Sequence, residues 1–154
     1  MKFLKWLVAI VVAVPVLLVG GIYIRNMAVG AEGWAKDDAA KALKEKMKDP
    51  DSMVIRSEYI VKSIAPTGDE QIAVCGIVDG KNGFGAFTGG LRFVAISYHD
   101  TKAKTFKTYS VEMDNTSIAD RATAKQVKQL TAFEEVYWNK NCVDDTHPAL
   151  VFEG

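Results

Sequence analysis

The feature that most constrains this chain is an uncharged run of nineteen residues from Trp6 to Ile24. A helix rises about 1.5 Å per residue, so a run of this length can cross the roughly 30 Å hydrocarbon core of a bilayer. Trp6 and Tyr23 stand at the two ends of the run, where interfacial aromatic residues are common. We therefore expect residues 6–24 to form a transmembrane helix.

Charges around this run predict how the chain is oriented. Lys2 and Lys5 precede the run, and only Arg25 follows it closely, so the positive-inside bias keeps the N-terminus in the cytoplasm and exports the rest. A cleaved signal peptide is the alternative, since Ala28-Val29-Gly30 is an acceptable cleavage site. We therefore expect a single-pass protein of the bacterial inner membrane. Its expected parts are a cytoplasmic segment at 1–5, the transmembrane helix at 6–24, a linker at 25–33, a periplasmic domain at 34–142 and a tail at 143–154.

Length and charge limit what the exported part can be. The chain has 154 residues, so the part beyond the anchor matches one ordinary domain of about 120 residues. Nineteen basic residues balance nineteen acidic ones. Because nucleic acids prefer strongly basic partners, we expect no nucleic-acid partner.

Cys75 and Cys142 are the only cysteines in the chain. In an oxidising compartment two such cysteines are expected to pair. A redox or nucleophilic cysteine is the alternative, but the chain has neither a CxxC pair nor a histidine beside either cysteine. We therefore predict a Cys75–Cys142 disulfide, worth about 2 to 4 kcal/mol of stability.

Hydrophobic spacing predicts an α+β domain. Apolar residues at three-and-four spacing indicate one helix from Trp34 to Lys48 and another from about Ser117 to Asn139. Alternating or continuous apolar runs indicate four strands between these helices, at 53–64, 71–78, 91–99 and 105–111. The predicted fold is a four-stranded, mainly antiparallel sheet with the helices on one face and the C-terminal helix packed on the sheet.

Two of these strands carry more specific predictions. The strand at 71–78 is apolar on both faces, which indicates a central strand that is covered on both sides. The strand at 53–64 alternates, which predicts a half-exposed strand with one apolar face. The residues expected on that face are Met53, Ile55, Tyr59 and Val61.

The segment from Asp79 to Gly90, which we call the Gly/Phe loop, holds five glycines and two phenylalanines in twelve residues. Glycines permit unusual backbone geometry, and exposed aromatic rings supply contact area at low entropy cost. The alternative is that both rings fold back onto the core and the glycines serve turns and bulges. The predicted contact surface consists of Lys81, Asn82, Phe84, Phe87 and Arg92.

Motifs for catalysis or metal binding are missing from the sequence. It has no GxSxG elbow, no HExxH pair and no complete P-loop or dinucleotide fingerprint. His99 and His147 are the only histidines, too few for a zinc site without further ligands at suitable spacing. We therefore expect no enzymatic activity, no cofactor and no metal.

Three short motifs resemble a pattern in small proteobacterial and prophage-encoded, membrane-anchored proteins of unknown function. They are Lys48-Asp49-Pro50-Asp51-Ser52, then Val74-Cys75-Gly76, then Lys81-Asn82-Gly83-Phe84-Gly85 with Gly89 and Phe93, all within residues 45–95. The layout of anchor and exported domain is also similar to that of phage superinfection exclusion proteins, a likeness of architecture alone.

These observations lead to one main functional expectation and two alternatives. The main one is a non-enzymatic periplasmic binding module, held at the inner membrane, that contacts an envelope or phage protein through the Gly/Phe loop. The resemblance implies a more specific alternative, which is superinfection exclusion by blocking phage DNA entry, or toxin immunity. The other alternative is a small envelope enzyme, which would need titratable groups that converge in a pocket.

Overall fold

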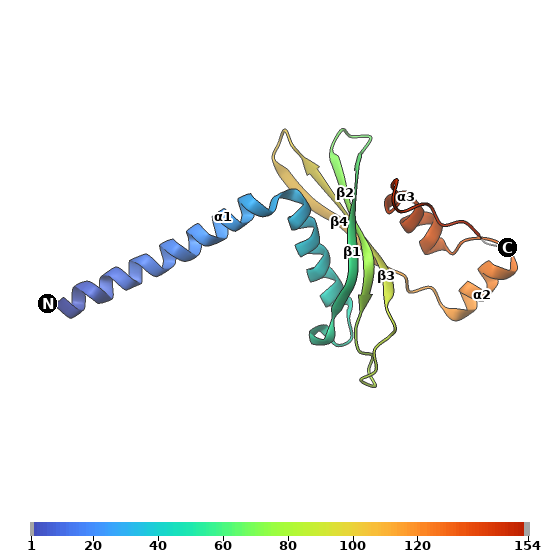
Figure 1. Cartoon of the computed structure of the whole chain (residues 1–154), viewed down its shortest axis with the longest axis horizontal. Coiled ribbons are helices and arrows are strands. Elements are labelled where there is room, and N and C mark those ends of the chain that lie inside the picture. Colours follow the sequence, from blue (N-terminus) through green and yellow to red (C-terminus); the bar gives the residue numbers. More distant parts are fainter. Residues whose placement is uncertain (1, 153–154) are drawn as a thin grey trace.

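The computed structural model describes the backbone of residues 2–152 and the side chains of residues 11, 13–17, 19–21 and 29–152. The chain folds as α+β, with one long helix, a four-stranded sheet and short C-terminal helices (Figure 1). The elements are α1 (Lys2–Lys46), the 3-10 turn η1 (Pro50–Ser52), β1 (Val54–Ile64), β2 (Glu70–Asp79), β3 (Leu91–Asp100), β4 (Thr105–Met113), α2 (Ile118–Gln126), the π-helical turn η2 (Glu134–Trp138) and α3 (Asn139–Asn141).

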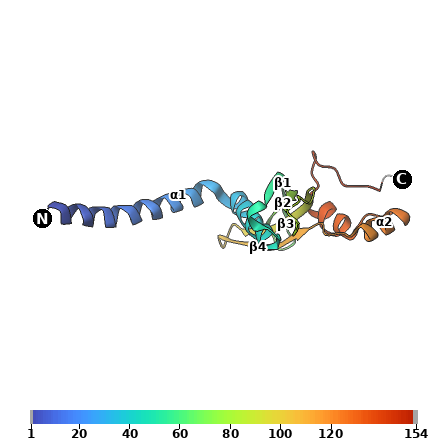
Figure 2. The same ribbon diagram turned by 90° about the horizontal axis from the view of Figure 1, so that it is seen from below.

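Helix α1 bends sharply at Gly30, which lies within the predicted linker at 25–33. Gly30 has φ 63° and ψ −173°, a backbone conformation that only glycine adopts readily. The part of α1 before Gly30 extends away from the sheet, and the part after it lies along one sheet face (Figures 1 and 2). The second part contains the predicted helix from Trp34, but it ends at Lys46, two residues before the predicted end at Lys48.

The predicted transmembrane helix occupies the first part of α1. Among the residues that the structure describes, no helical stretch has both the length and the hydropathy needed to cross a membrane. The side chains of Trp6 and Tyr23, expected at the membrane interfaces, lie outside the described residues.

The sheet is an antiparallel meander in the order β1-β2-β3-β4. Helix α1 packs on one face, where Ala35, Ala39 and Leu43 meet buried residues of β2 and β3. Phe133 from the C-terminal segment packs on the opposite face, against Cys75. The prediction that β2 is covered on both sides is confirmed, whereas the prediction that both helices share one face is wrong. A strand that is apolar on both faces needs a cover on each side.

A β-bulge in β1 corrects the prediction for that strand. Ile55 pairs with Val78, but Ser57 pairs with Ile77, so Arg56 is an extra residue in the ladder. Because an extra residue reverses the alternation of faces, Ile55 packs under α1 while Tyr59 contacts the opposite cluster. The apolar residues of β1 therefore serve both faces, and the one-face prediction is wrong.

The predicted helix from Ser117 to Asn139 is broken into two helical segments, α2 and the segment formed by η2 and α3. Ser117 caps α2 by accepting a hydrogen bond from the Asp120 backbone at 3.0 Å. Thr131 and Glu134 then form a reciprocal capping box, with hydrogen bonds of 2.9 and 3.3 Å, which begins a new helical segment. Lys128, at φ 58°, lies in the break. None of the residues of α2 is buried, whereas Phe133, Tyr137 and Trp138 of the second segment belong to the hydrophobic cluster on the sheet.

The Cys75–Cys142 disulfide is confirmed, with the two Cα atoms 5.8 Å apart. Both cysteines are fully buried. The Tyr59 hydroxyl adds a second link by donating a 2.8 Å hydrogen bond to the Cys142 carbonyl. The bridge and this hydrogen bond hold the C-terminal segment against the centre of the sheet.

Candidate functional site at the Gly/Phe loop

The Gly/Phe loop joins β2 to β3 at the end of the sheet far from the Gly30 bend (Figure 1). It forms a small hairpin in which Lys81 and Phe87 make an isolated antiparallel bridge. The Asn82 backbone N–H donates to the Ala86 carbonyl at 2.8 Å. The side-chain oxygen of Asn82 accepts from the Phe84 and Ala86 backbone N–H groups at 2.9 and 3.2 Å. Asn82 thus supports the hairpin from within.

The two phenylalanines of this hairpin face solvent. Phe84, at the tip, is 98% exposed, and Phe87 is 49% exposed. Next to Phe84, Gly85 has φ 80°, a conformation that other residues rarely adopt. The alternative in which both rings fold back onto the core is therefore wrong for Phe84. Exposed aromatic rings supply contact area at low entropy cost, so Phe84 and Phe87 make this hairpin a candidate contact surface.

Asp79 holds the base of the loop. Its side chain is fully buried, and Oδ1 accepts hydrogen bonds from the Gly80 N–H at 2.8 Å, the Thr88 N–H at 3.1 Å and the Thr88 hydroxyl at 3.0 Å. Its Oδ2 accepts from both Nε and Nη2 of Arg56, the former at 2.9 Å. One carboxylate thus ties the two ends of the loop to the neighbouring strand.

The bulge at Arg56 explains this arrangement. Bulges re-aim side chains, and here the guanidinium reaches both the Asp79 carboxylate and the Phe87 ring, whose centroid lies 6.0 Å from Arg56 Cζ. The Lys81 ammonium lies 5.9 Å from the same centroid. Phe87 therefore presents a half-exposed ring flanked by two cations, a geometry within cation–π range.

The turn before β1 supports the loop from the side. The Ser52 hydroxyl donates to the Asp49 carbonyl at 2.8 Å and accepts from the Lys81 backbone N–H, also at 2.8 Å. A Cβ placed on Gly80 would lie 3.0 Å from Met47 Sδ. The first and third motifs of the resemblance pattern, which are about 30 residues apart, are therefore in direct contact and form one structural unit.

Of the five predicted binding residues, the structure brings together Lys81, Asn82, Phe84 and Phe87. Arg92 lies elsewhere, because its guanidinium pairs with Asp114 at 2.8 Å and with Glu134 at 2.6 Å. It also lies over the ring of Trp138, at 5.4 Å from the centroid. Arg92 therefore connects β3 to the C-terminal segment.

Sequence reasoning did not identify Asp79 and Arg56 as residues of the site. A usable signal was present for Asp79, since an acidic residue at the end of a doubly apolar strand must find partners when it is buried. Arg56 carried no comparable signal, because its role depends on the bulge and on a partner 23 residues away.

No protein-family model matches this chain, and searches of curated proteins and of solved structures found no match.

His99 is the residue on which the enzyme alternative depends most. Its Nδ1 lies 3.3 Å from the Glu70 carboxylate, which also pairs with Lys62 at 3.4 Å. The Trp34 ring meets the imidazole edge to face, with the centroids 6.4 Å apart. These groups lie next to α1 just after the Gly30 bend, at the end of the sheet away from the Gly/Phe loop.

Asp79→Asn should destabilise the domain and reduce its sensitivity to acid. The hydrogen bond from Arg56 is the main cause that lowers the pKa of Asp79 from 3.8 to about 2. A carboxyl group whose pKa is lowered in the folded state stabilises the fold fully at pH values above its ordinary, unfolded-state pKa. This stabilisation is lost as the pH falls through the pKa of the folded state. Urea unfolding between about pH 6 and pH 2 should therefore show a shallower loss of stability in the variant.

Asp144 provides an internal reference for this experiment, since the Thr146 hydroxyl helps to lower its pKa to about 2 as well. Both proteins retain Asp144, so the difference between their pH profiles isolates Asp79. The control variant Asp51→Asn removes only an exposed ion pair with Lys44, and such pairs contribute little. Equal acid profiles for wild type and Asp79→Asn would contradict the role given to Asp79.

Proposed function

We propose that this chain is a non-enzymatic binding module that engages an envelope or phage protein through Phe84 and Phe87 of the Gly/Phe loop. The observation that carries the proposal is the 98% exposure of Phe84 on a hairpin whose backbone is held by internal hydrogen bonds. An ordered loop with an exposed aromatic tip loses little entropy when it binds, because most of the ordering is complete beforehand.

The chemistry of the loop defines the partner surface that would fit it. Phe84 calls for an apolar pocket, since burial of one phenylalanine ring contributes about 1.5–3 kcal/mol. The Lys81 ammonium stands beside the second ring, whereas the charge of Arg56 is balanced by Asp79; a cation at the rim of an interface favours acidic partners and faster association. The proposed partner surface is an apolar pocket with carboxylates at its edge.

The proposed anchor at residues 6–24 would hold the module at the bacterial inner membrane, with the domain in the periplasm. Support comes from the uncharged run in the sequence and from the buried disulfide, since structural disulfides persist mainly in oxidising compartments. Tethering raises the effective concentration of a binding module near membrane partners, so that moderate intrinsic affinity suffices.

Phe84→Ala combined with Phe87→Ala should weaken partner capture about 30-fold or more, as expected for loss of an aromatic hot spot. The measurement is crosslinking in intact membranes followed by pull-down of the full chain and quantification of the captured protein. The unfolding free energy should fall only slightly, because Phe84 has almost no packing to lose and Phe87 is half exposed.

Ile118→Ala is the matched control, since Ile118 is an apolar residue with 89% exposure outside the loop. It should leave capture unchanged. If the double variant loses stability in proportion to capture, or if Ile118→Ala weakens capture equally, the loop is not the contact surface. A reporter fused to the C-terminus tests the anchor separately, because a cytoplasmic reporter would refute the proposed orientation.

A further inference from the structure

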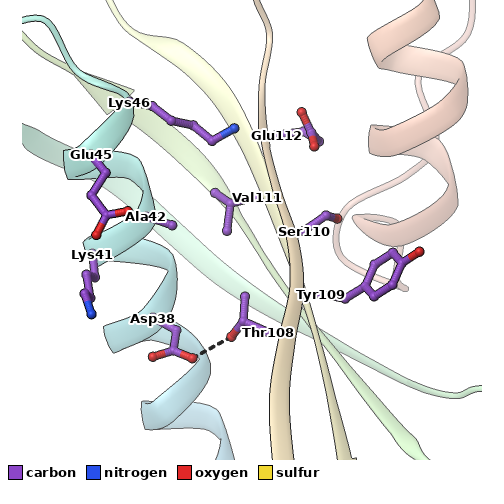
Figure 3. Close-up of a pocket in the computed structure, with 10 residues that line it drawn as sticks. All are labelled: Asp38, Lys41, Ala42, Glu45, Lys46, Thr108, Tyr109, Ser110, Val111 and Glu112. Atoms are coloured by element: carbon purple, nitrogen blue, oxygen red, sulfur yellow. Dashed lines mark hydrogen bonds between the residues drawn. The ribbon is translucent and has the colours of Figure 1, made fainter.

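Strand β4 forms one edge of the sheet, and a groove runs between it and α1. The groove has a volume of about 500 Å³. Its walls are residues 38–46 of α1 and residues 108–112 of β4 (Figure 3). The Thr108 hydroxyl donates a 2.7 Å hydrogen bond to Asp38 across the groove. An edge strand leaves backbone donors and acceptors unpaired, so it offers a template for one more strand.

A bulge gives this edge an unusual pattern of faces. Ile96 pairs with Ser110 and Ser97 with Thr108, so Tyr109 is an extra residue in β4. Figure 3 shows Thr108 and Val111 on the α1 side of the strand, and Tyr109, Ser110 and Glu112 on the other side. The alternation of faces is therefore reversed between the two halves of β4.

We propose that β4 pairs with β4 of a second copy of this chain, antiparallel, with Tyr109 of each copy opposite Ser110 of the other. This register places Lys107 opposite Glu112 of the second copy, on the face away from α1. It places Thr108 opposite Val111 on the α1 side, and Phe106 opposite Met113. Opposite charges directly across an antiparallel pair stabilise it, and the two-fold axis repeats the Lys107–Glu112 pair.

The bulge selects this register among the alternatives. Residues that lie directly opposite each other in an antiparallel pair must project from the same face. A shift of two residues in one direction would place Thr108 opposite Tyr109, and these two side chains project from different faces of β4. A shift of two residues in the other direction would place Ser110 opposite Val111, and these side chains also project from different faces. Among these three registers only the proposed one matches faces at every pair.

The surroundings of β4 suit a second copy. Lys107 and Glu112 have no ion-pair partner among the described residues, and Tyr109 is 73% exposed. Side chains of an added strand that point toward α1 would enter the groove. The N-terminal half of α1 points away from the sheet (Figures 1 and 2). A two-fold axis normal to the sheet would keep both α1 helices on the same face, so both N-terminal halves would leave from that face. That arrangement is compatible with one shared membrane if the proposed anchor is correct.

Cysteine crosslinking of the full chain in detergent or membranes tests the register. Lys107→Cys and Glu112→Cys should form a covalent dimer when the two variants are mixed and oxidised, because directly opposed Cα atoms lie within disulfide range. Each variant alone should crosslink at least 10-fold less. A mixture of Glu58→Cys and Lys62→Cys on the other edge strand, β1, is the matched control and should also crosslink at least 10-fold less.

Charge reversal provides an independent readout by sedimentation equilibrium. Lys107→Glu should weaken dimerisation about 10-fold or more, since two like-charge pairs replace two favourable ones. The double variant Lys107→Glu with Glu112→Lys should restore it. A chain that stays monomeric at every concentration, a double variant that fails to restore dimerisation, or a Lys107–Glu112 mixture that crosslinks no better than the β1 control would each overturn the proposal. A monomer that instead captures an extended peptide along β4 would overturn it too.

Discussion

Gly76→Ala should lower the unfolding free energy of the domain by about 3 kcal/mol, the upper end of the usual cost of overpacking a core. A Cβ at this position would lie 2.1 Å from the Ser57 carbonyl oxygen, 2.9 Å from Phe93 Cε1 and 3.0 Å from the Glu58 Cα. Two of these three atoms belong to the backbone of β1. The added methyl group can be accommodated only if the two strands separate, which breaks ladder hydrogen bonds.

Gly83→Ala is the matched control for this prediction. Gly83 lies in the Gly/Phe loop, and a Cβ there meets nothing within 4 Å. Both substitutions lower the entropy of the unfolded chain in the same way, so the difference between them reports the steric conflict alone. Urea unfolding at neutral pH measures both variants. A Gly76→Ala protein as stable as the Gly83→Ala protein would mean that β1 and β2 are not packed as described.

Removal of both disulfide cysteines should cost about 2 to 4 kcal/mol. The bridge closes a loop with a sequence separation of 67 residues, and cross-linking residues this far apart removes much of the freedom of the unfolded chain. Cys75→Ala with Cys142→Ala is the suitable variant, because it leaves no free thiol in the core. Its unfolding midpoint in urea should fall well below that of the oxidised wild type.

Reductant separates this effect from a simple packing loss. Dithiothreitol should lower the stability of wild type toward that of the double alanine variant, while the variant itself should not respond. Both cysteines are fully buried, so reduction should follow opening of the C-terminal segment and be slow under native conditions. A wild-type protein with equal stability in the oxidised and reduced states would contradict the predicted contribution of the bridge.

Much of the sheet was predictable because its signals are local. The apolar run at 71–78 indicated a doubly covered strand, and β2 lies between β1 and β3 with a cover on each face. The C-terminal segment was predicted less well, although its sequence held the needed signal. Ser117 with Asp120 and Thr131 with Glu134 both have the spacing of helix caps, and two helix starts in one apolar stripe indicate two helices.

The candidate site was predictable in part. The composition of the loop points to Lys81, Asn82, Phe84 and Phe87, because a twelve-residue loop with five glycines and two aromatic residues is uncommon. The exposure of Phe84 and the internal role of Asn82 were not predictable, since both depend on how the hairpin closes. Proximity in sequence places Arg92 with the loop, but its ion-pair partners lie 22 and 42 residues away.

By itself the sequence determined the order of helices and strands in the sheet region, the pairing of the only two cysteines and the identity of the unusual loop. These features follow from covalent chemistry and from periodicity among near neighbours. Only the tertiary structure decided the bulges at Arg56 and Tyr109, the partners of Asp79 and the assignment of helices to opposite sheet faces. The physical reason is that a ladder register and a buried charge are satisfied by residues far away in the chain, whose positions are set only when the whole sheet has formed.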